Sequence, residues 1–313
     1  MNKNLEATQF VVDHADAVHI DMDRIGAFAA AFHKEPIAHW MTLEPFALTG
    51  YREDQQLFAQ LLLSTWAFSY WGEPKWTIEY AGAKLDGFYG NVACVRRAME
   101  EGIPILDPMY CSSISEDTLR GVFRGNTEIP LFDERLAMIR EIGAVISERY
   151  HGKVGSLLLM ASNDAAQLLD IIIRDFPSFC DTSMYKGREV FFQKRAVFFV
   201  MNMHQWLMMR GEQGLTNFDQ IPACSDYKIP QMLRQHGILV YSRGLAETID
   251  HKIEILHGAP EEVEIRAGTI VAVDRIACAV RVAPQDVSDV LWISSQKKTG
   301  TEKPYHRSRT TAY

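Results

Sequence analysis

The chain has 313 residues, of which 47% are hydrophobic, so it can bury a core without disulfides and is neither collagenous nor disordered. Its formal net charge of −8 argues against a protein that binds nucleic acid through many phosphate contacts. Its five dispersed cysteines form no CxxC pair, and we find neither a signal-peptide-like beginning nor a long apolar run. We therefore predict a soluble, cytoplasmic protein that does not associate with membranes.

Helical periodicity dominates the sequence. Residues 54–70 are apolar on more than one face and predict a central, buried helix, whereas residues 133–150 carry one apolar stripe and predict a surface helix. Ser162 is the expected N-cap of the following helix. Further helices are expected over residues 162–176, 194–210 and 229–237, and an amphipathic one over 261–282.

Extended structure is expected in two short stretches. Residues 76–80 and 84–88 flank an Ala-Gly-Ala turn and predict a β-hairpin, and residues 190–192 predict a short strand. The βαβ rhythm of a nucleotide-binding sheet is absent. We therefore predict a mainly α fold with a small β-hairpin element, folded as a single domain over residues 1–313.

The common catalytic and cofactor motifs are missing from the sequence. It contains no GxGxxG, GxxxxGK[ST], HExxH or DxDxDG pattern and no GxSxG elbow. Its histidines are scattered, without a pair at helical spacing. We expect neither a metal site nor a cofactor.

Two segments contain unusual combinations of residue types, each of which has a structural and a functional interpretation. Residues 67–72 (AFSYWG) gather three aromatic residues around a serine, as in a buried helix end or in a platform for a planar heterocycle. Residues 191–196 (FFQKRA) place two charges at the start of an apolar helix. Such charges usually reach solvent at a helix end, whereas a buried lysine marks a catalytic or phosphate site.

Two later segments are equally ambiguous. Residues 224–231 (CSDYKIPQ) place Asp226 just before a helix, where it is either an ordinary N-cap or a carboxylate directed at a ligand. Residues 304–310 (PYHRSRT) belong to the most basic part of the chain, which is either a solvated tail or a phosphate clamp.

Together these segments resemble the queuosine salvage protein family, the queuosine 5′-phosphate N-glycosylases. The first 60 residues match poorly. Nine segments in the same order carry the resemblance: FSYW (68–71), RAMEEGIPI (97–105), NTEIPLFDER (126–135), FPSFCD (176–181), GREVFFQKRA (187–196), SDYKIPQ (225–231), GILVYS (237–242), EVEIRA (262–267) and PYHRSRT (304–310).

The resemblance implies hydrolysis of the N-glycosidic bond of queuosine 5′-monophosphate, which releases queuine, a 7-deazaguanine used in tRNA modification, and ribose 5-phosphate. It also implies a fold similar to helix-hairpin-helix DNA glycosylases. By position, Asp226 matches the catalytic aspartate and Lys194 the active-site lysine. The residues expected to bind substrate are Phe68, Ser69, Tyr70, Trp71, Tyr227, Lys228, His306 and Arg307. Lys194, Lys228, His306 and Arg307 compete as the cation for the phosphate.

Three departures from the family pattern predict a shift in substrate range, to the nucleoside or to a related deazapurine. They are Ala67 in place of Asn, Ser225 in place of Ala, and Ile293 in place of an acidic residue. Two other functions remain open, a nucleic-acid base glycosylase and a non-catalytic protein that binds a deazapurine nucleotide. In the leading hypothesis the partner is a small molecule and not a nucleic acid.

Overall fold

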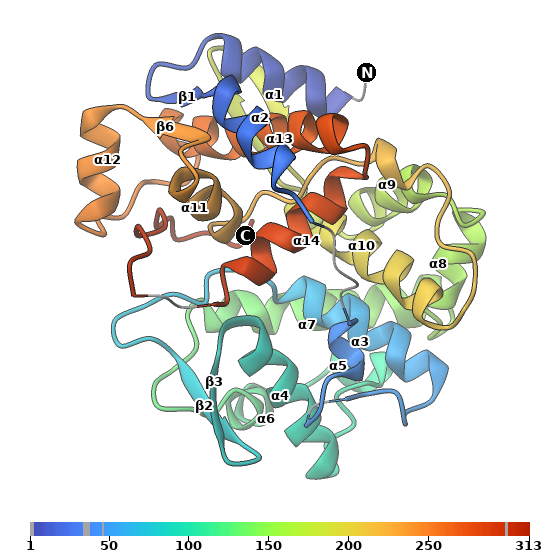
Figure 1. The fold of residues 1–313 in the computed structure, drawn as a ribbon. Helices are drawn as coiled ribbons and strands as arrows, with labels where there is room; N and C mark the ends of the chain where they lie inside the picture. The colour runs from blue at the N-terminus through green and yellow to red at the C-terminus, as the bar shows by residue number, and fades with distance from the viewer. Residues whose placement is uncertain (1–2, 34–37, 46, 298–299) are drawn as a thin grey trace. The chain divides into compact units, whose positions relative to one another are not determined.

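The computed structural model describes residues 3–33, 38–45, 47–297 and 300–313 (Figure 1). Over these residues the fold is mainly helical, with fourteen α-helices and three antiparallel strand pairs, which confirms the predicted fold class. Among them, no helix is both long enough and apolar enough to cross a lipid bilayer.

The helices are α1 (Lys3–Asp13), α2 (Met22–Ala30), α3 (Glu53–Thr65), α4 (Gly87–Glu100), α5 (Pro108–Ser112), α6 (Glu116–Val122), α7 (Phe132–Arg149), α8 (Gly155–Met160), α9 (Ala165–Asp175), α10 (Lys194–Met209), α11 (Lys228–Gln235), α12 (Arg243–Asp250), α13 (Pro260–Val280) and α14 (Pro284–Ser294). The strand pairs are β1 (Val18–Ile20) with β6 (Leu239–Tyr241), β2 (Thr77–Tyr80) with β3 (Ala83–Asp86), and β4 (Thr182–Tyr185) with β5 (Arg188–Phe191).

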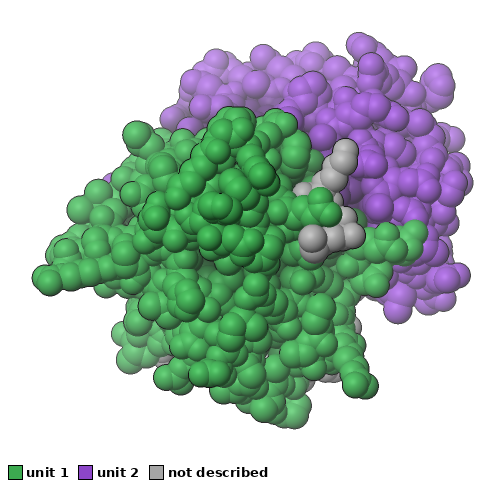
Figure 2. Space-filling model, turned by 90° about the horizontal axis from the view of Figure 1, so that it is seen from above, with its two compact units in different colours: residues 1–36, 181–197, 217–313 green, residues 37–180, 198–216 purple. Residues whose placement is uncertain are grey.

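The chain divides into two compact units, each assembled from separate stretches of sequence (Figure 2). Unit 1 comprises residues 1–36, 181–197 and 217–313, and unit 2 comprises residues 37–180 and 198–216. The expectation that residues 1–313 fold as a single domain stays a prediction.

Unit 1 is built around α13. Proline occupies the first turn of this helix, where no N–H is needed, and the chain leaves it through Arg281 in the left-handed region (φ 58°). The side chains of α1, β4 and β5 cover α13 in an apolar cluster that includes Val11, Phe192 and Val263. Because α13 is buried along most of its length, the prediction of an amphipathic helix was wrong here.

The N-terminal stretch of the chain is tied to α13 by a buried carboxylate. Glu264 accepts hydrogen bonds from the backbone N–H groups of Asp16 (3.1 Å), Ala17 (2.7 Å) and Val18 (3.1 Å). The Tyr185 hydroxyl donates a fourth bond, at 2.8 Å. Residues 16–18 are therefore anchored to α13 within unit 1.

Unit 2 packs α3 and α5 against α7. Gly143 of α7 lies so close to α5 that a Cβ atom there would meet the backbone of Pro108 and Ser112. The helix α3 is buried from Gln56 to Thr65, as expected from the apolar residues on more than one of its faces. The helix α7 buries its apolar stripe and exposes its polar face. The absence of a side chain at Gly143 thus allows two helices to approach at backbone distance.

Most predicted elements are present, with shifted ends. The predicted hairpin is β2–β3, the strand near residue 190 is β5, and the six predicted helices correspond to α3, α7, α9, α10, α11 and α13. The N-cap of α9 is Asp164, whose carboxylate accepts from the Gln167 amide, and not Ser162, which has a positive φ of 50°. The pairing of β1 with β6 was not predicted, because its strands are 221 residues apart (18 and 239).

Candidate active site

Asp226 lies at the start of α11 in unit 1 and is 7% exposed. Its Oδ1 accepts hydrogen bonds from the backbone N–H groups of Lys228 (2.7 Å) and Ile229 (2.9 Å). Asp226 lies one residue before Tyr227, the N-cap residue of α11, but these bonds satisfy amides that a helix start leaves without partners, so its Oδ1 has the capping role that the sequence predicted. The other oxygen, Oδ2, makes no hydrogen bond with any residue that the structure describes. One half of the carboxylate is thus fixed and the other half is available for chemistry.

Lys194 is the first residue of α10 and is 7% exposed. Burial lowers the pKa of its amine, and the nearby carboxylate of Asp226 partly offsets this effect. The thiol of Cys224 donates to the Lys194 carbonyl oxygen (3.7 Å), so the chain segment of Asp226 contacts the first turn of α10. The alternative that this charge extends into solvent is wrong, because Lys194 and Arg195 are both buried.

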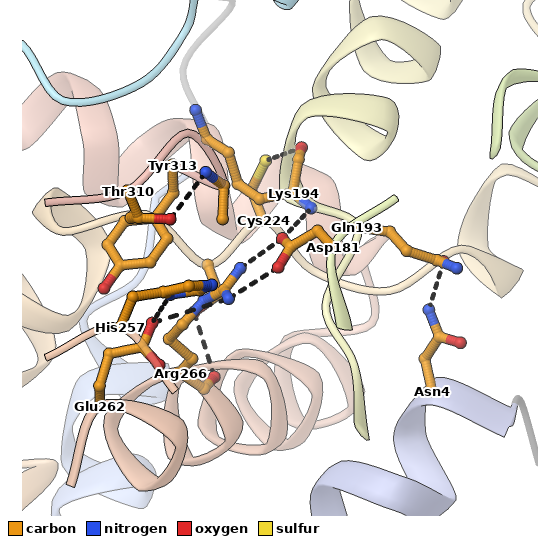
Figure 3. Close-up of polar contacts among 12 residues, drawn as sticks. Asn4, Asp181, Gln193, Lys194, Cys224, His257, Glu262, Arg266, Thr310 and Tyr313 are labelled. Carbon is orange, nitrogen blue, oxygen red and sulfur yellow. Dashed lines mark hydrogen bonds and ion pairs between the residues drawn. The ribbon is translucent and has the colours of Figure 1, made fainter. Parts of the chain in front are cut away.

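A buried ion network lies beside Lys194 (Figure 3). Arg266 of α13 binds Asp181 with its two terminal guanidinium nitrogens, at 2.9 and 2.5 Å, and Asp181 accepts a hydrogen bond from the backbone N–H of Lys194 at 3.2 Å. Glu262 lies one helical turn away, 3.7 Å from Arg266. Burial alone would raise the pKa of Glu262, but the His257 ring, whose Nδ1 lies 3.4 Å from Glu262 Oε1, and the charge of Arg266 lower it to about 2.

In the basic segment 304–310, His306, Ser308 and Thr310 are buried and only Arg309 is exposed, which contradicts the interpretation as a solvated tail. His306 is 2% exposed, and its Nε2 lies 3.1 Å from the Tyr313 hydroxyl. Burial lowers the pKa of His306 to about 4, so the ring is neutral at pH 7 and carries no charge for a phosphate. The backbone carbonyl of Arg307 accepts a bond from the Ile255 amide (2.8 Å), which attaches the segment to unit 1.

Tyr227 and Lys228, which follow Asp226 in the chain, form a half-buried cluster with Tyr305. The rings of Tyr227 and Tyr305 are 4.9 Å apart between centroids, and the Lys228 ammonium lies 4.8 Å from the Tyr305 centroid. The Lys228 Nζ also donates to Gln231 Oε1 (3.1 Å). The structure therefore brings Tyr227 and Lys228 next to Asp226 and adds Tyr305, which sequence reasoning did not select although it lies in the 304–310 motif.

The aromatic motif 68–71 belongs to unit 2 and is buried there. Its residues are 0 to 5% exposed, and Ser69 adopts a positive φ of 35°. Arg135 of α7 places its guanidinium 4.0 Å from the Phe68 ring centroid and donates to the Phe68 carbonyl at 2.6 Å. The Tyr70 hydroxyl accepts from Asn91 (2.9 Å), and burial raises its pKa to about 12. The role of Phe68, Ser69, Tyr70 and Trp71 in binding stays a prediction.

Metal-binding side chains do not gather in the described part of the chain. Among those residues, no three His, Cys, Asp or Glu side chains are grouped as ligands of one ion, and all five cysteines are free thiols. Burial raises the pKa of the Cys224 thiol to about 12, so it is not a thiolate at neutral pH. The charged side chains that shift the pKa of the Lys194 amine are Asp226, which raises it, and Arg195 and Arg266, which lower it.

Comparisons with known proteins agree with the resemblance seen in the sequence. A family model described as queuosine salvage protein matches residues 51–313. A protein of Sphaerobacter thermophilus named queuosine 5′-phosphate N-glycosylase/hydrolase is 37% identical over 99% of this chain and 97% of its own length. Proteins with the same name in Schizosaccharomyces pombe (30% identical, 88% of this chain, 85% of the relative) and Mus musculus (27%, 98% and 98%) are also similar.

Proposed function

The chain belongs to the queuosine salvage protein family, and on this premise we propose that it hydrolyses the N-glycosidic bond of queuosine 5′-monophosphate. The products are free queuine and ribose 5-phosphate. The observation that supports this function best is the buried carboxylate of Asp226, with one oxygen fixed by the start of α11 and the other available.

The geometry of Asp226 suits the chemistry of the reaction. Loss of a base from a ribosyl carbon passes through an oxocarbenium-like state, which an adjacent carboxylate stabilises while it activates the attacking water. A carboxylate fixed by two backbone N–H groups is preorganised and does not have to reorient during the reaction. Asp226 Oδ1 has this anchoring role, and we assign the contact with the anomeric carbon or the water to Oδ2.

Lys194 supplies the complementary group. A 7-deazapurine has a carbon atom where guanine has N7, so the departing base cannot be protonated there and its charge must be met elsewhere. An amine beside the catalytic carboxylate can hydrogen-bond to the substrate, and the lowered pKa of Lys194 makes proton transfer near neutral pH easier. We therefore assign Lys194 to the catalytic site with Asp226.

The 5′-phosphate needs a cation that is charged at neutral pH. His306 does not meet this condition, since its pKa is lowered to about 4. Lys228 is a lysine two residues from Asp226, with its side-chain nitrogen over the Tyr305 ring. We propose that Lys228 and Arg307 hold the phosphate and that Tyr227 contributes to the same pocket.

The remaining parts of the proposal rest on the family resemblance. They are substrate contacts by Phe68, Ser69, Tyr70 and Trp71, a fold similar to helix-hairpin-helix DNA glycosylases, a cytoplasmic location and action without a cofactor. The substrate is a small molecule, and the net charge of −8 supports the absence of a nucleic-acid partner.

The decisive experiment is a direct assay of base release. The protein is incubated with queuosine 5′-phosphate, queuosine or guanosine 5′-phosphate, and the free base is measured by mass spectrometry. We expect queuine from queuosine 5′-phosphate, no guanine, and an unchanged rate in EDTA. Intact queuosine 5′-phosphate after prolonged incubation with folded protein would overturn the proposal. Release from queuosine alone would instead assign the nucleoside as the substrate.

A further inference from the structure

Arg266 in α13 connects the two chain segments that carry Lys194 and Asp226. Its guanidinium binds both oxygens of Asp181, and Asp181 Oδ2 in turn accepts the backbone N–H of Lys194 (3.2 Å). The backbone carbonyl of Arg266 accepts the hydroxyl of Ser225 (3.1 Å), the residue before Asp226. One residue of α13 therefore holds the start of α10 through its side chain and the segment before α11 through its backbone.

The surroundings of Arg266 leave its guanidinium little freedom. The side chain is fully buried, with the Phe192 ring centroid at 4.0 Å and the Tyr313 ring centroid at 4.5 Å. A planar, bidentate guanidinium fixes both the distance and the direction of its carboxylate partner. Asp181 is 6% exposed, so neither member of the pair is screened by solvent. The position of the first turn of α10 thus depends on this ion pair.

We propose that Arg266 is a positioning residue of the N-glycosidase: through Asp181 it fixes the first turn of α10 and hence the place of the Lys194 amine beside the Asp226 carboxylate. This inference rests on the proposed function for the reaction, but the geometry it concerns belongs to the free protein. Arg266 touches neither substrate nor water in this scheme and acts through its neighbours.

The pKa of the Lys194 amine provides a test of the proposal that does not depend on the stability of the fold. Arg266 lies close enough to lower the pKa of the Lys194 amine, and Asp181, its ion-pair partner, carries the opposite charge. Removing Arg266 leaves Asp181 unpaired, so the pKa of Lys194 rises. Removing the charge of Asp181 leaves Arg266 unpaired, so the pKa of Lys194 falls. The other titratable groups near the amine are Arg195, Cys224 and Asp226, and they are left unchanged in both variants.

The test compares Arg266→Met, Arg266→Lys and Asp181→Asn with a matched control pair. The control is Arg234 and Asp250 in the same unit, which form a similar bidentate pair at 2.8 and 3.0 Å and contact neither Lys194 nor Asp181. Folding is checked by circular dichroism and cooperative melting. The kinetic parameters kcat and KM are measured across pH. The pKa of the Lys194 amine is measured by nitrogen-15 NMR, with Lys194→Arg used to assign the signal.

We expect Arg266→Met to lower kcat about 100-fold while KM changes less than about threefold, because misplacement of a catalytic group acts on the transition state. Arg266→Lys restores part of the rate, and the pKa of Lys194 moves up in Arg266→Met and down in Asp181→Asn. The control variants Arg234→Met and Asp250→Asn leave kcat unchanged. If Arg266→Met does not fold, Arg266→Lys and Asp181→Asn decide the question.

Three results would overturn the proposal. They are a kcat within about threefold of wild type in the folded variants, a pKa of Lys194 that moves in the same direction in both, or an equal loss of kcat in the control pair. A wild-type protein that releases no base would refute the proposed function instead. In that case the NMR measurement still decides whether Arg266 and Asp181 set the state of Lys194.

Discussion

Replacement of Asp226 by asparagine separates the two tasks of this side chain. Its Oδ1 caps α11, and an asparagine carbonyl can accept the same bonds from Lys228 and Ile229. Asn and Asp are nearly equivalent N-caps, and the lost charge at the helix start adds only a small term, so the free energy of unfolding should change by at most about 1 kcal/mol. The catalytic task requires the negative charge, which asparagine lacks.

The loss of activity in Asp226→Asn should be far larger than the loss of stability. We expect the rate of base release to fall about 1,000-fold, which corresponds to about 4 kcal/mol of transition-state stabilisation. Asp107→Asn is the matched control, because Asp107 caps α5 with the same pattern, accepting from Met109 (2.9 Å) and Tyr110 (3.2 Å). This control should keep the wild-type rate.

The assay is single-turnover release of base from queuosine 5′-phosphate, combined with urea unfolding and calorimetric titration of the nucleotide. Retained binding with lost turnover supports catalysis by Asp226. A folded Asp226→Asn protein that keeps the rate within about tenfold of wild type would refute the assignment, because a carboxylate that stabilises the transition state cannot be dispensable. A wild-type protein that binds without turnover would support the non-catalytic alternative.

Two further predictions concern stability. The pKa of His306 is lowered to about 4, so the unfolded chain binds the proton more tightly and the stability present above pH 6.5 is lost as pH falls toward 4. The free energy of unfolding should fall by on the order of 3 kcal/mol in this range, and His306→Gln should remove that part of the slope in urea titrations at several pH values; an unchanged slope would contradict the neutral state of His306. Gly143→Ala should destabilise the protein by about 3 kcal/mol, since the added methyl group meets the backbone of α5. Gly121→Ala, with nothing within 4 Å of the new atom, should be neutral or stabilising; equal melting temperatures for the two variants would refute the packing argument.

Local sequence patterns predicted α3, α7, α9, α10, α11 and α13, in which a helical spacing of apolar residues or a clear terminal residue can be recognised. The other helices were missed, including α4 with 14 residues. In α5 and α8 five or six residues hold too little of the helical period to be recognised. The predicted cap Ser162 was displaced by Asp164, whose carboxylate is the stronger acceptor and whose backbone is extended. Prediction from sequence patterns was therefore best for helices and strands whose own residues show the helical or extended period.

The candidate site shows the same limit. Asp226 could be located from the sequence because an acidic residue before a helix is a local pattern. The partnership of Arg266 with Asp181 spans 85 residues, and no spacing rule connects them. The buried state of His306 was likewise hidden, because a basic segment looks solvated until its packing is seen. A signal was available for Arg266, as a charged residue inside the largely apolar run of 263–273 requires a partner.

The hydrogen bonds that Glu264 accepts from residues 16–18 have a consequence for folding during synthesis on the ribosome. Residues 16–18 emerge early, yet the carboxylate that receives their amides is 246 to 248 residues further along the chain. Unit 2 is complete at residue 216, so its helices can assemble while β1 still lacks both its partner strand and its anchor. Unit 1, which holds Lys194 and Asp226, is therefore completed after unit 2, and its folding requires the closure of a very long loop.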